Sequence, residues 1–229
     1  RGRIEKVLDA AKAKGLRTGD NQARMRGHLE LFLPKRSKAA VKHHAALPYS
    51  EMPEFMAALR NREGIAAKAL EFTILTVARS GEVRGMTWGE VDLEAKLWTV
   101  PGDRMKASEE HVVPLSPAAL SVLQAVHEAG LKPDDVVFPA PRGGSLSDMT
   151  LSAVLKRMGL KVTVHGMRSS YRDWAGDTTA FPRDVVEMAL AHTVGSATER
   201  AYRRGRALDK RRKLMEAWAA YCDGKATSK

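Results

Sequence analysis

The stretch that most constrains the fold is IAAKALEFTILTVA, residues 65–78, which is apolar on nearly every helical face. A helix that is apolar all round has to be buried. Burial on every side requires other helices or strands around it, so we expect this segment to be the central helix of a domain. With 44% hydrophobic residues in 229, the chain has enough apolar material to form such a core.

The pattern changes over residues 91–115. Two β-rich stretches, LWTV (97–100) and HVVPL (111–115), are separated by the polar segment PGDRMKASEE. This arrangement predicts an antiparallel hairpin, with a third strand near Val91–Leu93. Helical patterns dominate elsewhere, and the expected helices are 50–61, 117–129, 147–158, 165–177, 182–190, 196–204 and 207–222. The predicted fold class is therefore mainly α with a small antiparallel β-sheet (α+β).

The first part of the chain has a helical pattern of its own, with apolar residues at helical spacing from Ile4 to Ala11. The basic segment 34–48, PKRSKAAVKHHAALP, has no periodicity and is typical of a linker. We therefore expect the end of a helical domain over 1–33, a linker over 34–48 and a second domain over 49–229. Because the chain begins at Arg1 within a helical pattern and without a methionine, we expect it to be part of a longer protein.

Lysine and arginine number 38 against 27 acidic residues, which gives a formal net charge of +11. This excess favours a polyanionic partner, most simply nucleic acid, although an indifferent basic surface would give the same count. The single cysteine, Cys222, excludes an internal disulfide and a multi-cysteine zinc site, and its apolar position favours a structural role. Adjacent histidines such as His43 and His44 point in different directions in most backbones, so they make a weak metal site. No apolar run has membrane-spanning length and no signal peptide is visible, so we expect a cytoplasmic protein without membrane contact.

Two arginines stand where they could bind an anion. His165 and Arg168 are three residues apart at the start of a predicted helix and share a face, near free backbone N–H groups. Arg79 directly follows the apolar segment and needs a partner for its charge, for which Glu82 is the candidate. The plainer readings are a surface helix with an ordinary His and Arg, and an arginine that caps its helix and reaches water.

Three further residues can be interpreted either as functional or as structural. Lys106 lies in the predicted hairpin turn, where most lysines are only solvated. His192 ends an apolar helix in Leu-Ala-His, and alone it favours a structural histidine. Tyr202 stands in a short segment between two glycines with arginines directly after it, whereas most tyrosines on such helices simply pack their ring.

The order of these motifs is more specific than any one of them. An Arg-x-Gly-Glu turn, a hairpin lysine, His-x-x-Arg, Leu-Ala-His and Ala-Tyr follow one another between Arg79 and Tyr202. This set resembles the active site of the tyrosine recombinases, the phage integrase family. The stretches HHAALPYSEMPEFM, ARSGEVRGMTW and AYRRG followed by KRR are similar to the integrases of satellite prophages and genomic islands. The resemblance covers roughly residues 45–222 and implies the tyrosine-recombinase catalytic domain over 49–229, with the end of a core-DNA-binding domain over 1–33.

The resemblance implies a covalent mechanism. Tyr202 would attack a DNA phosphodiester and form a 3′-phosphotyrosyl link that releases a 5′-hydroxyl, and a second DNA end would reverse the step. Phenol is a weak nucleophile near neutral pH, and His165 is the candidate that accepts its proton. Lys106 would protonate the leaving 5′-oxygen.

The remaining site residues would stabilise charge. Arg79 and Arg168 would hold the non-bridging oxygens of the phosphate, and His192 would donate to one of them. The bond energy is kept in the covalent link, so we expect no cofactor. We also expect no metal ion, because no carboxylate cluster suited to Mg²⁺ accompanies these residues.

Exchange of strands needs two duplexes, so the family pattern implies a homotetramer on double-stranded DNA attachment sites in the bacterial cytoplasm, with a directionality factor as a candidate further partner. The tail after Tyr202 could close the core of its own chain or dock on a neighbouring subunit. Two rival functions remain at this stage. A type IB topoisomerase uses similar chemistry to relax DNA, and a non-catalytic DNA-binding module would need only the basic surface.

Overall fold

The computed structural model describes residues 1–33, 44–105, 107–192 and 207–225. The chain divides into two compact units, Arg1–His43 and His44–Lys229. In the first, helix α1 (Gly2–Ala13) is followed by a loop and a short 3₁₀ turn, Leu29–Leu31. The side chain of Asn21 joins the loop to the helix by donating to the Glu5 carbonyl and the Asp9 carboxylate, both at 2.8 Å. The helix predicted near the start of the chain is confirmed, whereas the predicted domain boundaries stay predictions.

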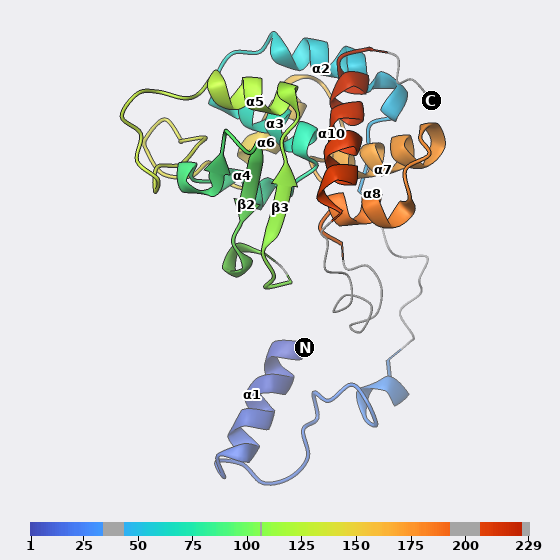
Figure 1. Cartoon of the computed structure of the whole chain (residues 1–229). Coiled ribbons are helices and arrows are strands. Elements are labelled where there is room, and N and C mark those ends of the chain that lie inside the picture. Colours follow the sequence, from blue (N-terminus) through green and yellow to red (C-terminus); the bar gives the residue numbers. More distant parts are fainter. Residues whose placement is uncertain (34–43, 106, 193–206, 226–229) are drawn as a thin grey trace. The chain divides into compact units, whose positions relative to one another are not determined.

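Helix α3 (Ile65–Thr76) is the centre of the second unit, as predicted. It packs against α2 (Met52–Arg60), α4 (Ser80–Arg84), α5 (Pro117–Gln124), α6 (Thr150–Arg157) and α10 (Leu208–Cys222) (Figure 1). Every residue from Ala69 to Thr76 is buried. The helix ends at Val77, which has a left-handed φ of 49° and turns the chain toward Arg79. Arg79, which follows directly on the buried helix, is thereby partly exposed to solvent.

The small sheet is antiparallel, with strand order β1 (Val91–Asp92), β2 (Leu97–Val100) and β3 (His111–Pro114). Trp98 pairs with Val113 across β2 and β3, and the Trp98 ring lies 5.6 Å from that of Phe72 in α3. The predicted hairpin and its third strand are confirmed. The face of the sheet that carries Trp98 therefore packs on the central helix α3.

The further helical elements of the described unit are the 3₁₀ turns Tyr49–Glu51, Trp88–Glu90 and Gly102–Arg104 and the helices α7 (Gly166–Thr178) and α8 (Arg183–Ala189). Some predicted boundaries are wrong. The 117–129 helix ends at Gln124, and the His127 ring beyond it packs on Trp88 with centroids 4.8 Å apart. The 147–158 helix begins only at Thr150, whose hydroxyl is 2.8 Å from that of Ser147. The helix predicted over 50–61 begins only at Met52, because Ser50 lies inside the 3₁₀ turn Tyr49–Glu51. The predicted helix 196–204 lies outside the described residues.

Helix α10 closes the core of its own unit. Its buried face includes Leu214, Met215, Trp218 and Cys222, and it packs on α8, α3, α2 and α5. The Trp218 indole donates to the Ile74 carbonyl at 2.9 Å. Within this chain the tail helix thus packs on its own core, and the choice between this packing and docking on a neighbouring subunit stays a prediction; Cys222 is buried as expected. None of the described helices is both long and apolar enough to cross a membrane.

Candidate active site

Arg79 and Glu82 form a closed pair at the start of α4. The Arg79 backbone N–H donates to Glu82 Oε2 at 2.8 Å, and its guanidinium Nη1 donates to Oε1 at 2.7 Å. Glu82 is buried, with 5% of its side chain exposed, whereas Arg79 keeps 26% exposed. The buried carboxylate of Glu82 holds the Arg79 guanidinium, part of which remains open to solvent. Glu82 is thus the partner expected from the sequence.

Arg168 lies in the first turn of α7 and is buried. Its guanidinium donates to the carbonyls of Val77 and Leu190, the latter at 2.5 Å. Burial lowers the pKa of Arg168 to about 10, and the nearby positive charge of Arg79 acts in the same direction. The side chain remains charged at neutral pH. The two guanidiniums, called the arginine pair below, therefore lie close enough to repel each other.

The end of α8 supplies neutral acceptors for the arginine pair. Backbone bonds from Ala191 N–H to the Met188 carbonyl and from His192 N–H to the Glu187 carbonyl, both 3.0 Å, close the helix in a Schellman-type turn with Ala191 at φ 50°. The Leu190 carbonyl then accepts from Arg168. The next carbonyl, of Ala191, accepts from Arg79 Nη2 at 3.3 Å. One helix end thus orients both arginines.

His192 follows this turn directly and is half-exposed, with Nδ1 2.6 Å from Glu187 Oε2. His165 precedes α7, and its ring centroid is 4.7 Å from that of His44. Burial lowers the pKa of His165, helped by the positive charges of Arg168, His44, Arg79 and His192. Four residues singled out from the sequence, Arg79, His165, Arg168 and His192, therefore come together at one place in the second unit.

Close packing holds His165 where it is. A side chain at Gly166 would collide with the Ala45 carbonyl, so only glycine fits there. The same carbonyl accepts from the Thr163 N–H at 2.9 Å, and the Thr163 hydroxyl accepts from Gly166 N–H at 2.9 Å. The segment beginning at His44 is thereby fastened to the start of α7.

Lys106 and Tyr202 lie outside the described residues. Sequence reasoning missed two residues that the structure brings to this place, His111 and Arg211, and it considered His44 only as a weak metal ligand. Histidine at the start of a strand and arginine in a basic helix form no motif of their own. Only the fold could reveal that they lie near Arg79 and Arg168.

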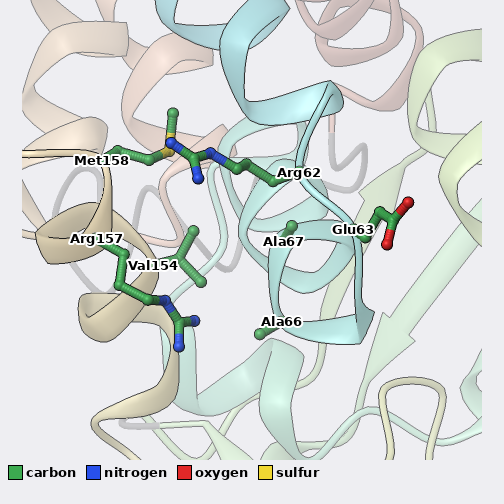
Figure 2. Close-up of a pocket in the computed structure, with 7 residues that line it drawn as sticks. All are labelled: Arg62, Glu63, Ala66, Ala67, Val154, Arg157 and Met158. Atoms are coloured by element: carbon green, nitrogen blue, oxygen red, sulfur yellow. The ribbon is translucent and has the colours of Figure 1, made fainter.

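A separate hollow of about 320 Å³ lies between the α2–α3 link and α6. Figure 2 shows Arg62 and Arg157 at its two sides, with Ala66, Ala67 and Val154 also among its lining residues. Ala66 and Ala67 are in the first turn of α3, whereas Arg79 lies beyond its last turn, and the helix between them rises by about 14–15 Å. This hollow is therefore not part of the arginine site.

Within the described ranges, no three His, Cys, Asp or Glu side chains are grouped so that they could hold a metal ion. The arrangement at the end of α8 offers guanidinium and imidazole donors instead. Such donors suit an oxyanion that carries one or two charges, for instance a phosphodiester in the act of transfer.

Comparison with known proteins gives a consistent result. A model described as the phage integrase family matches residues 46–208. The integrase of Enterobacteria phage P4 is 32% identical in an alignment 209 residues long, which covers 82% of this chain and 47% of that protein. The chain therefore spans about half the length of the curated relatives it matches.

Solved structures show the same fold. An integrase from mycobacterium phage Brujita superposes with a TM-score of 0.60 at 19% identity, covering 100% of this chain and 72% of that one. A lambda integrase tetramer bound to a Holliday junction gives a TM-score of 0.54 at 17% identity, covering 86% of this chain and 56% of that one.

Proposed function

The chain belongs to the phage integrase family, and on this premise we propose that it is a site-specific DNA recombinase that acts through a 3′-phosphotyrosyl intermediate. The observation that carries the proposal is the meeting of Arg79, Arg168, His165 and His192 at the end of α8, inside the region that the family model matches.

The arginine pair would bind the scissile phosphate. A phosphoryl group in transfer gathers charge on its non-bridging oxygens, and fixed cations lower the barrier most when they need no rearrangement. Arg79 is held by Glu82 and Ala191, and Arg168 by Val77 and Leu190, so both guanidiniums are already in place. Half-exposed His192 would donate to a further oxygen.

Proton transfer completes the reaction. Tyr202 would attack phosphorus, its proton passing to His165, and Lys106 would give a proton to the departing 5′-oxygen. The lowered pKa of His165 supports the first part, because a neutral imidazole can accept a proton at physiological pH. The second DNA end then attacks the phosphotyrosine, which restores the phenol and joins the strands.

The partners proposed are double-stranded attachment sites, and the assembly is a homotetramer. The lambda integrase in the comparison is a tetramer on a Holliday junction, and this chain shares its fold. A directionality factor is proposed as a further partner, and the protein would act on DNA in the bacterial cytoplasm.

The test is covalent capture. A labelled library of duplexes, each nicked close to the cleavage position so that the freed strand diffuses away, is incubated with the chain and resolved on a denaturing gel. The wild type should give a protein–DNA adduct, and Tyr202→Phe should bind DNA but give none. Tyr221→Phe is the matched control, because Tyr221 lies in α10 and its hydroxyl only reaches the Tyr49 carbonyl at 3.2 Å.

An adduct of normal yield from Tyr202→Phe would contradict the assigned nucleophile. The captured sequence then serves two further assays. Exchange of strands between two labelled duplexes supports a recombinase, whereas relaxation of a supercoiled plasmid without exchange would indicate a topoisomerase.

A further inference from the structure

The carboxylate of Glu187, in α8, has a different partner on each of its two oxygens. Oε2 lies 2.6 Å from His192 Nδ1, and Oε1 lies 3.1 Å from Arg172 Nε. The Nε atom of Arg183, one turn earlier in α8, is 4.0 Å from Oε1 as well. Only 16% of the Glu187 side chain is exposed, against 50% for Arg172 and 42% for His192. The carboxylate is therefore the most buried member of this group.

The backbone ties Glu187 and His192 together a second time. The His192 N–H donates to the Glu187 carbonyl at 3.0 Å, so the residue after the helix is joined to it by both main chain and side chain. Arg172 comes from α7, where it stands four residues after Arg168. Its ion pair with Oε1 joins the Glu187 carboxylate to α7 and leaves Oε2 for the imidazole.

The contact between Glu187 and His192 determines which nitrogen of the ring is available to a ligand. An ionised carboxylate only accepts hydrogen bonds, so Nδ1 carries the proton in this pair. Nε2, at the opposite edge of the ring, is then the nitrogen left for a further partner. It can donate to a phosphate oxygen only if it carries a proton as well. An imidazole that lies between two anions favours this doubly protonated form.

We propose that Glu187 is a positioning residue, which accepts from His192 Nδ1 and thereby turns Nε2 toward the scissile phosphate. The proposal rests on the proposed function, in which His192 donates to a non-bridging oxygen. Glu187 itself would not touch the DNA, because its two oxygens already face His192 and Arg172. It would act through the ring, as the aspartate of a Ser-His-Asp triad holds its imidazole in one tautomer and one orientation.

The first test is Glu187→Leu, which keeps an apolar stem and removes both acceptor oxygens. The rate of adduct formation is measured in a single turnover at saturating duplex, with DNA affinity and melting temperature measured alongside. The Leu variant should be slower by ~10–100-fold, as for a lost hydrogen bond to a charged group, with affinity little changed. A wild-type rate for this variant would overturn the proposal.

Glu71→Leu is the matched control. Glu71 is a buried carboxylate in α3 that pairs with Arg60 Nε at 2.6 Å, and none of its described partners is a candidate site residue. Its loss should lower the melting temperature and keep the rate within about threefold of the wild type at a temperature where both variants are folded. An equal loss of rate in Glu71→Leu and Glu187→Leu would show general damage and overturn the proposal.

A double variant tests whether Glu187 acts through the ring. His192→Ala removes the imidazole, so Glu187 has nothing left to orient. In that background Glu187→Leu should slow the reaction by less than about threefold, against ~10–100-fold in the wild type. The same factor in both backgrounds would mean that the two residues act independently, which would overturn the proposal.

The tautomer of His192 gives a readout that needs no catalysis. Long-range nitrogen–proton NMR spectra identify the proton-bearing nitrogen of each histidine ring, and the His192 signals are those lost in His192→Ala. At a pH where the ring is neutral, the proton should be on Nδ1 in the wild type and no longer confined to Nδ1 in Glu187→Leu. An unchanged tautomer in the variant would overturn the proposal.

Two provisions keep the outcome clear. If Glu187→Leu fails to fold, Glu187→Met takes its place as the variant without acceptor oxygens. If the wild type itself forms no adduct, the proposed function fails, whereas the tautomer measurement still decides whether Glu187 holds the His192 ring.

Discussion

Acid should destabilise the second unit through His111, and the size of the effect follows from its surroundings. The imidazole is held neutral by burial and by Arg211, Arg79 and Arg168, with a pKa of about 4 against an ordinary 6.5. Between these two values the unfolded chain takes up a proton that the folded chain does not. Stability therefore falls as the pH drops from 6.5 to 4 and is unaffected by this group above 6.5.

The magnitude comes from the difference of about 2.5 pKa units at about 1.36 kcal/mol each, which gives about 3 kcal/mol when fully developed. At pH 5 about 2 kcal/mol of this is already lost. The pKa of His165 is also lowered and adds a loss of its own, so the wild type alone cannot isolate the effect of His111.

The assay is urea unfolding followed by tryptophan fluorescence at pH 7.5, 6 and 5, with His111→Gln as the reference that cannot titrate. All four tryptophans lie in the second unit, so the signal reports on it alone. The free energy of unfolding of the wild type should fall by about 2 kcal/mol more than that of the Gln variant between pH 7.5 and 5. Parallel pH profiles for the two proteins would refute the reasoning.

Four other expectations are open to direct measurement. Lys106→Ala should slow cleavage by ~10²–10⁴-fold with near-normal binding, and sulfur in place of the bridging 5′-oxygen should restore Lys106→Ala but not Arg79→Ala; rescue of both or neither would remove Lys106 as the general acid. DNA binding should weaken with salt at a log–log slope of roughly −0.9 per phosphate contacted, and a flat response between about 50 and 200 mM would contradict a nucleic-acid partner. Cleavage should persist in excess EDTA, and a loss that Mg²⁺ reverses would indicate another chemistry. Gly166→Ala, which pushes a methyl group into the Ala45 carbonyl, should cost about 1–3 kcal/mol in urea unfolding, and unchanged stability would show that the contact yields freely.

What the sequence could predict was local pattern and motif order. The mostly apolar sequence of α3 and the alternation in LWTV indicate a buried helix and a strand by themselves, and the structure has both where they are predicted. The ends of helices were missed where a tertiary contact decides them, as where His127 turns aside to pack on Trp88. The hairpin, the helices and the core are predictable from periodicity because the buried face of each element has to be apolar.

The candidate site was predictable only in part, and for a related reason. Arg79 and Arg168 were found because each stands in a motif at a helix end. His111 was not, because its neighbours come from α7, α8 and α10 and none of them is near in sequence. A residue whose neighbours are all distant in sequence leaves no local motif.

The carbonyls at the end of α8 have a consequence for selectivity. Among the described hydrogen bonds of the arginine pair, Glu82 is the carboxylate, and Val77, Leu190 and Ala191 contribute neutral oxygens. A backbone carbonyl accepts from a guanidinium without cancelling its positive charge. Acid does not protonate the carbonyl, so the hydrogen bond does not depend on pH. The proposed phosphodiester substrate would therefore meet guanidiniums held mainly by backbone oxygens. A point mutation of Val77, Leu190 or Ala191 changes the side chain and leaves the accepting carbonyl in place.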